Sequence, residues 1–489
     1  MINLLQNIET TKWYLNIIRQ GLKPAQHPKK VIVIGAGIAG LVTSSLLKKA
    51  GHQVTLIEAR TRVGGRVFTM RSPFTSGLYM DMGAMRISEN HKLTLEYIKK
   101  FSLPLNEFIN GSDNDLLFVN GIKTRYKHYK RHPAILNFPV TPQEQQQTAT
   151  ELLQNALSPL LQQIETSQDS LDQLIKQFDS YSVMDYLRHN PFNVHLSQGA
   201  LDMIEVLLDV EAFSTLSFLE IFNQYLMLIC INPGVFYEIE GGNDRLPQCF
   251  LPELDASLLL NKRVVRIAMD GEKVFVSMTS TDGGETTTLA CNDVVMTVPL
   301  PVLQFINITP RHLFSYEKWK VIQSVHYGAA MKIAIEFKER FWEKEGLEGG
   351  KAVSDLPIRF TYYPSHSIPG TKHGVILASY TWENDTLPWE GLDEKERIRL
   401  ALDNLAQLHG HKIYDLFVTG ASYSWLQDPW AAGGFSAYQP GNRLRFGKAC
   451  TQPEQHIHFA GEHASSHPAW IEGAVESGIR TALEIHEKD

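Results

Sequence analysis

Four residues near the start of the chain have the types and spacing needed to hold a phosphate-bearing nucleotide: Gly35, Gly37, Gly40 and Glu58. The glycines form the pattern G-x-G-x-x-G. In that pattern the first glycine makes a tight turn, the second lets a pyrophosphate approach the backbone, and the third lets a helix pack closely on a strand. Glu58 follows where a carboxylate can accept hydrogen bonds from ribose hydroxyls. We interpret the group as a dinucleotide-binding site; the alternative is a structural turn that binds nothing.

The sequence around these glycines predicts the elements that would position them. Residues 31–34 form an apolar strand, residues 38–49 a helix and residues 54–58 a second strand, with Gly51 ending the helix. Such a βαβ unit should have a right-handed crossover. The helix N-terminus would then face the pyrophosphate with its unpaired backbone N–H groups.

Arg86 could bring a different chemistry. It ends the stretch "DMGAMR" (81–86), where it follows Met85 and two small residues, with no acidic residue beside it. Burying a guanidinium without a partner is costly, and its planar fork matches a carboxylate through two parallel hydrogen bonds. The stretch therefore indicates an anionic ligand. The alternative is a structural arginine paired with a distant Asp or Glu.

A second small-residue turn follows the predicted βαβ unit. In "RTRVGGRV" (60–67), Gly64, Gly65 and Arg66 place a cation where it could reach the same pyrophosphate. The alternative is an ordinary surface turn with a solvated arginine.

Between residues 141 and 230, apolar residues recur at helical spacing and predict a helical subdomain. Ser158 and Pro159 fit an N-cap and a first helical position, so we expect one helix to end and another to begin there. Further along, "SVMDYL" predicts a capping box between Ser182 and Asp185.

From residue 261 the apolar period switches to two, which is typical of strands. Residues 263–278 predict a hairpin that turns at Asp270-Gly271. Residues 293–299, 331–337 and 373–382 predict further strands, and residues 471–488 predict an amphipathic helix.

The composition excludes several functions. The chain has 489 residues, 43% of them hydrophobic, and a formal net charge of -7, so nothing steers it towards nucleic acid or an anionic membrane. Its longest apolar run is far shorter than the roughly 20 residues of a membrane-spanning helix, and the N-terminus lacks a signal-peptide pattern. Four widely spaced cysteines show no metal-ligand spacing. We expect a soluble cytoplasmic protein with no metal site.

The segment "VIVIGAGIAGLVTSSLLKKAGHQVTLIEARTRVGGRV" (31–67) resembles the FAD signature of the flavin-dependent amine oxidases. Residues 237–248, 293–299 and 457–482 resemble later segments of the same family, and residues 77–125 resemble its L-amino-acid oxidases most closely. The resemblance implies FAD. Because the C-terminal motif has no cysteine except Cys450, upstream of it, we expect the FAD to be held non-covalently.

The implied fold is α/β: a G-x-G-x-x-G FAD-binding domain built from discontinuous segments, a mixed-sheet substrate domain and a helical subdomain. The FAD-binding domain would comprise residues 28–70, 233–320 and 446–489. The substrate domain would comprise 71–135 and 321–445, the helical subdomain 136–232, and residues 1–27 would form an N-terminal helix packing on the substrate domain.

The resemblance also assigns site residues. The cofactor would contact Gly35, Gly37, Ala39, Gly40, Glu58, Ala59, Arg60, Gly64, Gly65, Arg66, Gly83, Ala84, Met85, Arg86, Val265, Gly461, Glu462, Trp470 and Ile471. The substrate would contact Arg86, Tyr380, Tyr362, Phe435, Trp425, Trp470 and Ala469. In the family, the arginine of a G-x-M-R motif binds the substrate carboxylate, and here that residue is Arg86. Ala84 departs from the proline of some members.

A tyrosine should complete carboxylate binding, with Tyr380 preferred over Tyr362. Lys332 is the implied catalytic residue, because a family lysine at this position holds a water at flavin N5; the alternative is a solvated strand-edge lysine. Three histidines could act as bases, but the sequence pairs none of them with an acid: His326, His463 and His467. Gln224 stands where some members have a pocket histidine. We therefore assign no catalytic histidine.

The implied reaction is oxidative deamination of an L-amino acid, in which hydride passes to the flavin and dioxygen is reduced to hydrogen peroxide. The products would be a 2-oxo acid, ammonia and hydrogen peroxide. An apolar set of predicted pocket residues favours a hydrophobic or aromatic substrate: Phe435, Trp425, Leu226, Met227 and Ile229. The alternatives are an amino-acid 2-monooxygenase, a monoamine oxidase and a catalytically silent FAD-fold protein. The oligomeric state stays open, with a homodimer among the options.

Overall fold

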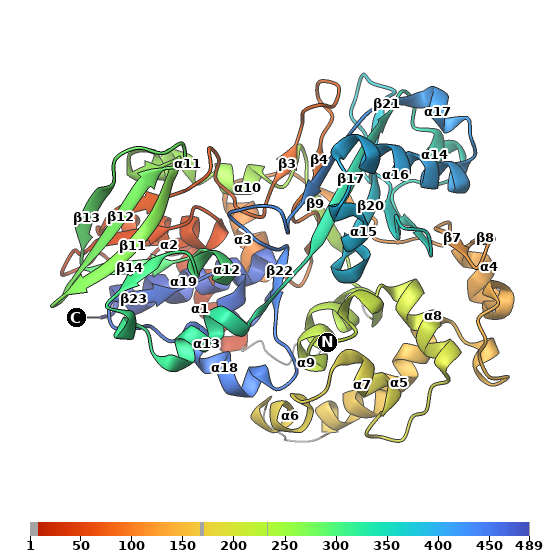
Figure 1. Ribbon diagram of the computed structural model, residues 1–489, viewed down its shortest axis with the longest axis horizontal. Coiled ribbons are helices and arrows are strands. Elements are labelled where there is room, and N and C mark those ends of the chain that lie inside the picture. The colour runs from red at the N-terminus through yellow and green to blue at the C-terminus, as the bar shows by residue number, and fades with distance from the viewer. Residues whose placement is uncertain (1–7, 167–170, 232, 489) are drawn as a thin grey trace.

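The computed structural model describes residues 8–166, 171–231 and 233–488. Figure 1 shows three groups of elements: strands β11 to β14 with their helices at one end, strands β17, β20 and β21 with α14 to α17 at the other, and helices α5 to α9 below them. The functional site described below lies where these groups meet.

A parallel five-stranded sheet carries the predicted glycine turn. Its strands, in spatial order, are β10 (Leu258–Leu259), β2 (Gln53–Ile57), β1 (Lys30–Ile34), β14 (Asp293–Met296) and β23 (Ile457–Phe459). All four pairs are parallel. The continuous apolar character of β1 and β14 fits a sheet that is covered on both faces. Helices α2 (Ile38–Lys49) and α19 (Ile471–His486) pack on each other beside it, which confirms the predicted strand–helix–strand unit and the buried strand at 293.

The predicted hairpin forms part of a four-stranded sheet beside the first one. Its strands, in spatial order, are β13 (Thr287–Cys291), β12 (Lys273–Ser280), β11 (Lys262–Asp270) and β15 (Asn307–Thr309). Gly271 takes a positive φ of 58° in the turn between β11 and β12. A register shift between Val264 and Arg266 leaves Val265 without a cross-strand partner, and such a bulge re-aims the strand locally.

A mixed seven-stranded sheet lies at the opposite end of the molecule. Its strands, in spatial order, are β21 (Phe417–Ser424), β17 (Ala330–Phe337), β20 (Gly374–Trp382), β19 (Phe360–Tyr362), β18 (Lys351–Ser354), β7 (Leu116–Val119) and β8 (Ile122–Arg125). Lys332 of β17 stands opposite Tyr380 of β20. Helix α16 (Glu394–His409) packs on one side of this sheet.

The middle of the chain is helical, as predicted. Its elements are α5 (Ala149–Thr166), α6 (Leu171–Phe178), α7 (Val183–Arg188), α8 (Gln198–Leu208), α9 (Phe218–Ile221) and the π-helix η4 (Phe222–Ile231). They surround a core that includes Leu153, Ile204 and Phe218. The capping box predicted between Ser182 and Asp185 begins α7.

The predicted break at Pro159 is wrong, because α5 continues through it. Proline has no N–H to donate to the carbonyl four residues earlier, which is that of Asn155. The Ser158 hydroxyl donates to that carbonyl instead, at 3.2 Å. The buried side chains of Leu157 and Leu160 hold both halves of the helix on the same core.

Two features bear on the predicted domain boundaries, which remain predictions. Helix α1 (Ile8–Gln20) packs on both α3 (Lys92–Lys100) and α19. Strand β9 (Phe236–Ile239) lies between β5 (Ile87–Ser88) and β6 (Leu105–Phe108) in one small sheet. The predicted boundaries assign β9 to the FAD-binding domain and its two neighbours to the substrate domain, so this sheet joins the two.

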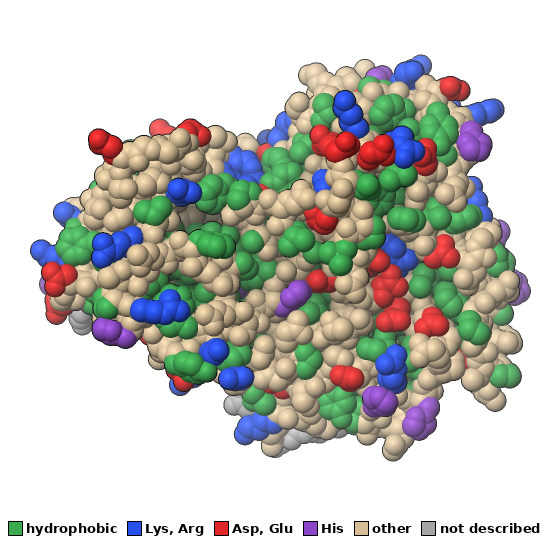
Figure 2. Space-filling model, in the orientation of Figure 1, with side chains coloured by type: hydrophobic (Ala, Val, Ile, Leu, Met, Phe, Trp, Pro, Cys, Tyr) green, Lys and Arg blue, Asp and Glu red, His purple; other side chains and the backbone are tan. Residues whose placement is uncertain are grey.

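The surface carries no single dominant charge on the face shown in Figure 2, where acidic and basic side chains are interspersed. Within residues 8–166, 171–231 and 233–488, no helix is both long enough and apolar enough to span a bilayer.

Candidate active site

Two adjoining cavities lie between the groups of elements. The larger has a volume of about 730 Å³ and runs along the carboxyl ends of β1, β2 and β14. The smaller, of about 100 Å³, lies between the seven-stranded sheet and α9–η4. Both are lined by Ala84, Tyr380, Trp382, Phe435, Ala469, Trp470 and Ile471. A molecule in the larger cavity would therefore share walls with one in the smaller.

The glycine turn has the geometry that its pattern predicts. Gly35 has a φ of 105°, and a Cβ there would lie 2.5 Å from Oγ1 of Thr297. A Cβ on Gly40 would lie 1.9 Å from the carbonyl oxygen of Gly35, so Gly40 sets how closely α2 approaches β1. Gly37, the N-cap of α2, has nothing within 4 Å of such a Cβ. The open side of the turn is thus the one that faces the larger cavity.

Glu58 stands at the carboxyl end of β2 on the cavity wall. Its carboxylate accepts hydrogen bonds from the backbone N–H of Ala36 at 2.7 Å and of Arg60 at 2.8 Å. Burial raises the pKa of Glu58 above its ordinary value. The side chain therefore links the glycine turn to the end of the second strand and holds it in one position.

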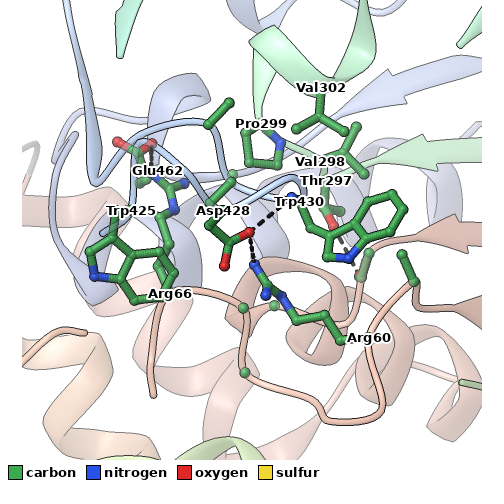
Figure 3. Close-up of a pocket in the computed structure, with 18 of the residues that line it drawn as sticks. Arg60, Arg66, Thr297, Val298, Pro299, Val302, Trp425, Asp428, Trp430 and Glu462 are labelled. Atoms are coloured by element: carbon green, nitrogen blue, oxygen red, sulfur yellow. Dashed lines mark hydrogen bonds and ion pairs between the residues drawn. The ribbon is translucent and has the colours of Figure 1, made fainter. Parts of the chain in front are cut away.

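Two arginines near the glycine turn form ion pairs with residues from the far end of the chain (Figure 3). Arg60 Nη2 lies 2.6 Å from Oδ1 of Asp428, and Arg66 Nη1 lies 2.8 Å from Oε1 of Glu462. Arg66 is thus not the solvated arginine of the alternative interpretation. Both arginines line the larger cavity.

Most of the predicted cofactor-contacting residues line the larger cavity. They are Gly35, Gly37, Ala39, Glu58, Ala59, Arg60, Gly64, Gly65, Arg66, Gly83, Ala84, Val265, Gly461, Glu462, Trp470 and Ile471. Gly40 lies behind the turn, and Met85 and Arg86 line only the smaller cavity. These three residues were predicted to contact the cofactor but do not line the larger cavity.

Several residues on the larger cavity were missed by the sequence analysis. They include Thr297, Val298, Pro299, Val302, Asp428 and Trp430, which Figure 3 labels. Thr297 directly follows β14, and ligands of parallel sheets bind beyond the carboxyl ends of the strands. The predicted strand at 293 was thus a sufficient signal for Thr297 to Pro299. Asp428 and Trp430 come from a loop and had no such signal.

Arg86 is buried on the wall of the smaller cavity. Its Nη1 donates to the side-chain oxygen of Asn110 and, at 3.3 Å, to the hydroxyl of Tyr362. Within the part of the chain that the structure describes, Arg86 forms no ion pair. The distant-carboxylate alternative is therefore wrong, and the guanidinium keeps a positive charge among neutral partners.

Lys332 is not the solvated lysine of the alternative interpretation, because it is only 1% exposed. Its Nζ donates to the backbone carbonyls of Asp81 at 2.9 Å and Gly83 at 2.7 Å, and lies 4.6 Å from the ring centroid of Tyr380. Burial lowers the pKa of Lys332 to about 7. The lysine lines neither cavity; it lies behind Gly83 and Tyr380, which do.

Aromatic rings form much of the smaller cavity. Tyr380 and Trp382 lie two residues apart in β20, so they share a face of the sheet, and their ring centroids are 4.8 Å apart. Trp382 also lies 5.0 Å from Phe435 and 5.3 Å from Phe213. Trp382 and Phe213 were missed, although the two-residue spacing from Tyr380 was a usable signal for the first.

The two predicted tryptophans differ in position. Trp425 lines only the larger cavity and donates its Nε1–H to the carbonyl of Met82 at 2.9 Å. Trp470 lines both cavities, and its Nε1 lies 3.3 Å from the carbonyl oxygen of Gln224. Tyr362 lines neither and reaches the smaller cavity only through Arg86.

The expectation that no acid pairs with the candidate histidines is wrong for two of them. His326 Nε2 lies 2.9 Å from Glu383, and His467 Nδ1 lies 2.8 Å from Glu476. Glu383 lies 57 residues from His326, and Glu476 lies nine residues from His467, in helix α19. Neither separation matches the three or four residues that bring side chains together on one helix, so the spacing gave no signal. His463 pairs with the hydroxyl of Tyr327 at 3.0 Å. None of these three described histidines lines either cavity.

Comparison with known proteins extends over nearly the whole chain. Residues 38–486 match the family described as flavin containing amine oxidoreductase. YobN of Bacillus subtilis (strain 168), provisionally named an L-amino-acid oxidase, is 45% identical over 486 residues, which cover 99% of each chain. The L-amino-acid oxidase of Siganus canaliculatus is 35% identical over 477 residues, covering 97% of this chain and 88% of the relative.

Solved structures share the fold at low sequence identity. Putrescine oxidase bound to putrescine has a TM-score of 0.77 at 19% identity, with 94% of this chain and 100% of that chain covered. Cyclohexylamine oxidase from Brevibacterium oxydans has a TM-score of 0.73 at 21% identity, with 94% and 99% covered. These likenesses confirm the predicted α/β architecture. The family match and the relatives aligned over nearly the whole chain show that this chain belongs to the flavin-containing amine oxidoreductase family.

Proposed function

We propose that the chain is an L-amino-acid oxidase, which converts L-amino acids to 2-oxo acids, ammonia and hydrogen peroxide. The observation that carries the proposal is Arg86, a buried cation on the wall of the smaller cavity with only neutral partners. A substrate carboxylate would supply its counter-charge, whereas an amine without a carboxylate would gain nothing from it. The names of the full-length relatives support the same activity.

The larger cavity fits FAD as the cofactor. Gly37 leaves open space at the N-terminus of α2, where a pyrophosphate would meet free N–H groups. Glu58 stands one strand away, where it can receive a ribose hydroxyl. The FAD would be held non-covalently, because none of the four cysteines, all of them described, lines either cavity.

The residues of the smaller cavity would orient the substrate. Arg86 would bind the carboxylate, with the hydroxyl of Tyr380 as a second contact and that of Tyr362 fixing the guanidinium. Trp470 and Phe435 would exclude water at the junction of the cavities. When bound, FAD supplies the acceptor for the hydride of the substrate and passes the electrons to dioxygen. Lys332 would hold a positive charge behind that junction.

An anaerobic titration tests the proposal. We expect the yellow protein to bleach fast with L-amino acids and only slowly with the corresponding decarboxylated amines. Under air, a 2-oxo acid should form; an amide with CO₂ would instead indicate a 2-monooxygenase. A protein that bleaches with phenethylamine but with none of the common L-amino acids would refute the proposal.

A further inference from the structure

The smaller cavity is apolar except at a few points. Its aromatic and aliphatic walls come from Phe213, Ile221, Tyr225, Trp382, Phe435, Ala437, Pro468 and Trp470. Besides Arg86 and the polar tips of the tyrosine and tryptophan rings, the polar side chains on the wall are Glu220, Gln224 and Ser436. A charged group in such surroundings needs a partner for each of its hydrogen-bonding atoms.

Two of these polar side chains are neutral, and each already makes a hydrogen bond within the protein. Gln224 Nε2 donates to the carbonyl of Ser466 at 3.2 Å, and Ser436 Oγ donates to Oε2 of Glu462 at 2.8 Å. They therefore connect neighbouring segments, and neither carries a charge that needs a counterpart.

Glu220 differs from them. Its side chain is 4% exposed, and Oε1 pairs with Nη1 of Arg443 at 2.8 Å. Oε2 is buried and has no hydrogen-bond partner among the described residues. A buried carboxylate oxygen left without a donor is unfavourable, so either the fold tolerates a defect or a ligand completes the site.

Glu220 does not cap the helix in which it lies. Ser217 and Glu220 have the spacing of a capping box at the start of α9 (Phe218–Ile221). The Ser217 side chain makes no capping hydrogen bond there. Glu220 instead pairs with Arg443 and is one of the residues that line the smaller cavity. Its position is thus not explained by the stability of its own helix.

We propose that Oε2 of Glu220 accepts a hydrogen bond from the side chain of the substrate, which makes the enzyme selective for aromatic L-amino acids that carry a donor on the ring. The inference rests on the proposed oxidase function and names its substrate class. The aromatic walls receive a planar ring, Arg86 receives the carboxylate, and Glu220 receives a phenol O–H or an indole N–H. A cationic side chain fits less well, because Arg443 already neutralises Glu220 and would repel a second cation.

The test compares kcat/KM for L-phenylalanine, L-tyrosine, L-tryptophan and L-lysine. Phenylalanine has the ring but no donor, tyrosine can donate and accept, and the indole of tryptophan only donates. We expect the wild type to prefer tyrosine and tryptophan over phenylalanine by about tenfold, the value of one hydrogen bond to a charged group. Lysine should be the poorest of the four.

Glu220→Gln makes the test sharper. The amide oxygen would keep the contact with Arg443, which leaves an N–H₂ group towards the cavity. That group cannot accept from indole, but it can donate to a phenol oxygen. The ratio of kcat/KM for tryptophan over phenylalanine should therefore fall about tenfold, while the ratio for tyrosine falls less. Glu205→Gln is the matched control: Glu205 is half-buried on α8 and lines neither cavity, and both ratios should stay as in the wild type.

The wild-type comparison decides the matter even if Glu220→Gln does not fold. A wild type that oxidises phenylalanine as efficiently as tyrosine and tryptophan, or that prefers lysine, overturns the role of Glu220 and leaves the oxidase function standing. Equal ratios in the wild type and in a folded Glu220→Gln variant overturn it as well. If none of the four amino acids bleaches the flavin, the selectivity fails; the oxidase function fails with it only if none of the other common L-amino acids bleaches the flavin.

Discussion

The hydroxyl of Tyr362 lies 3.3 Å from Nη1 of Arg86, and no carboxylate among the described residues shares that guanidinium. The tyrosine comes from β19 and the arginine directly precedes β5, so two separate sheets meet at a buried positive charge. Neutral partners fix its direction without cancelling its charge.

Arg86→Ala should therefore abolish most amino-acid turnover. A bidentate, partly desolvated contact is worth about 2–5 kcal/mol, or roughly 30- to 4,000-fold in kcat/KM. Arg86→Lys should recover only part, because an ammonium cannot bind both carboxylate oxygens in one plane. Phenethylamine is the control substrate, and its oxidation should change little. Benzoate, which carries a carboxylate, should inhibit the wild type and not the Arg86→Ala variant. If the variant oxidises phenylalanine with near-normal kcat/KM and is still inhibited by benzoate, Arg86 is structural.

Glu58→Ala should weaken the retention of FAD. Losing a charge-assisted hydrogen bond removes about 1.5–3 kcal/mol, roughly tenfold or more in affinity. Dialysis followed by the ratio of flavin to protein absorbance measures the effect. Glu272→Ala, at an exposed position in the turn after β11, is the control and should keep its flavin. Equal retention by both variants would remove Glu58 from the cofactor site.

Gly37 and Gly40 should respond differently to alanine. A Cβ on Gly40 would lie 1.9 Å from a backbone oxygen, so α2 would have to move, at about 1–3 kcal/mol in the free energy of unfolding. A Cβ on Gly37 meets nothing within 4 Å, so Gly37→Ala should fold normally and lose FAD affinity instead. Urea unfolding of the apoproteins and FAD titration separate the two effects. A Gly40→Ala apoprotein as stable as wild type would contradict the packing role.

Lys332→Met should slow the reoxidation of the reduced flavin by dioxygen more than its anaerobic reduction. A nearby cation stabilises the negative charge that develops when oxygen is reduced. Because burial lowers the pKa of Lys332 to about 7, wild-type reoxidation should also slow as the pH rises through 7, and the variant should lack this change. Stopped-flow absorbance measures both half-reactions. Identical reoxidation traces for wild type and variant at pH 6 would exclude the role.

His91 should make the protein sensitive to acid. Burial lowers the pKa of His91 to about 3 from an ordinary 6.5, and its Nδ1 accepts the N–H of Ser88 at 3.2 Å. Between these values the unfolded chain binds a proton that the folded chain does not, so the free energy of unfolding falls as the pH drops below 6.5. The slope is at most about 1.4 kcal/mol per pH unit.

Substitution isolates that contribution. His91→Asn keeps an acceptor for Ser88 and does not titrate, so its unfolding free energy should depend less steeply on pH between 6.5 and 4 than that of the wild type. His195→Gln, at an exposed position, should keep the wild-type slope. Parallel slopes for all three proteins would show that His91 does not contribute.

The sequence was most informative where a structural signal is local. The glycine turn, the hairpin at Gly271 and the capping box at Ser182 each depend on residues within one or two turns of chain, and the structure has all three. The continuity of α5 through Pro159 was not predictable in the same way. It depends on the Ser158 hydroxyl, which replaces the N–H that proline lacks, and on packing of α5 against side chains from the other helices.

The site was predictable in its residue types more than in its contacts. Arg66 was assigned to the cofactor, but its partner Glu462 comes from the other end of the chain. Glu383, beside His326, is 57 residues away along the chain, and Glu476 reaches His467 only because helix α19 packs beside the loop that precedes it. Glu220 was not identified from the sequence, because its partner Arg443 lies more than 200 residues further along the chain. Long-range neighbours are set by tertiary packing, which spacing along one sequence does not encode.

The parallel sheet under the larger cavity has a consequence for the order in which the chain can assemble. Its strand β1 is synthesised near the start, β14 in the middle and β23 close to the last residues. Helices α5 to α9 come from one continuous stretch and can begin to pack while synthesis proceeds. The glycine turn must wait with an unpaired strand edge until β14 and β23 arrive, so the cofactor should bind only after β23 has been synthesised. Damage near β23 or α19 would then cost the enzyme its flavin even though every residue of the glycine turn is intact.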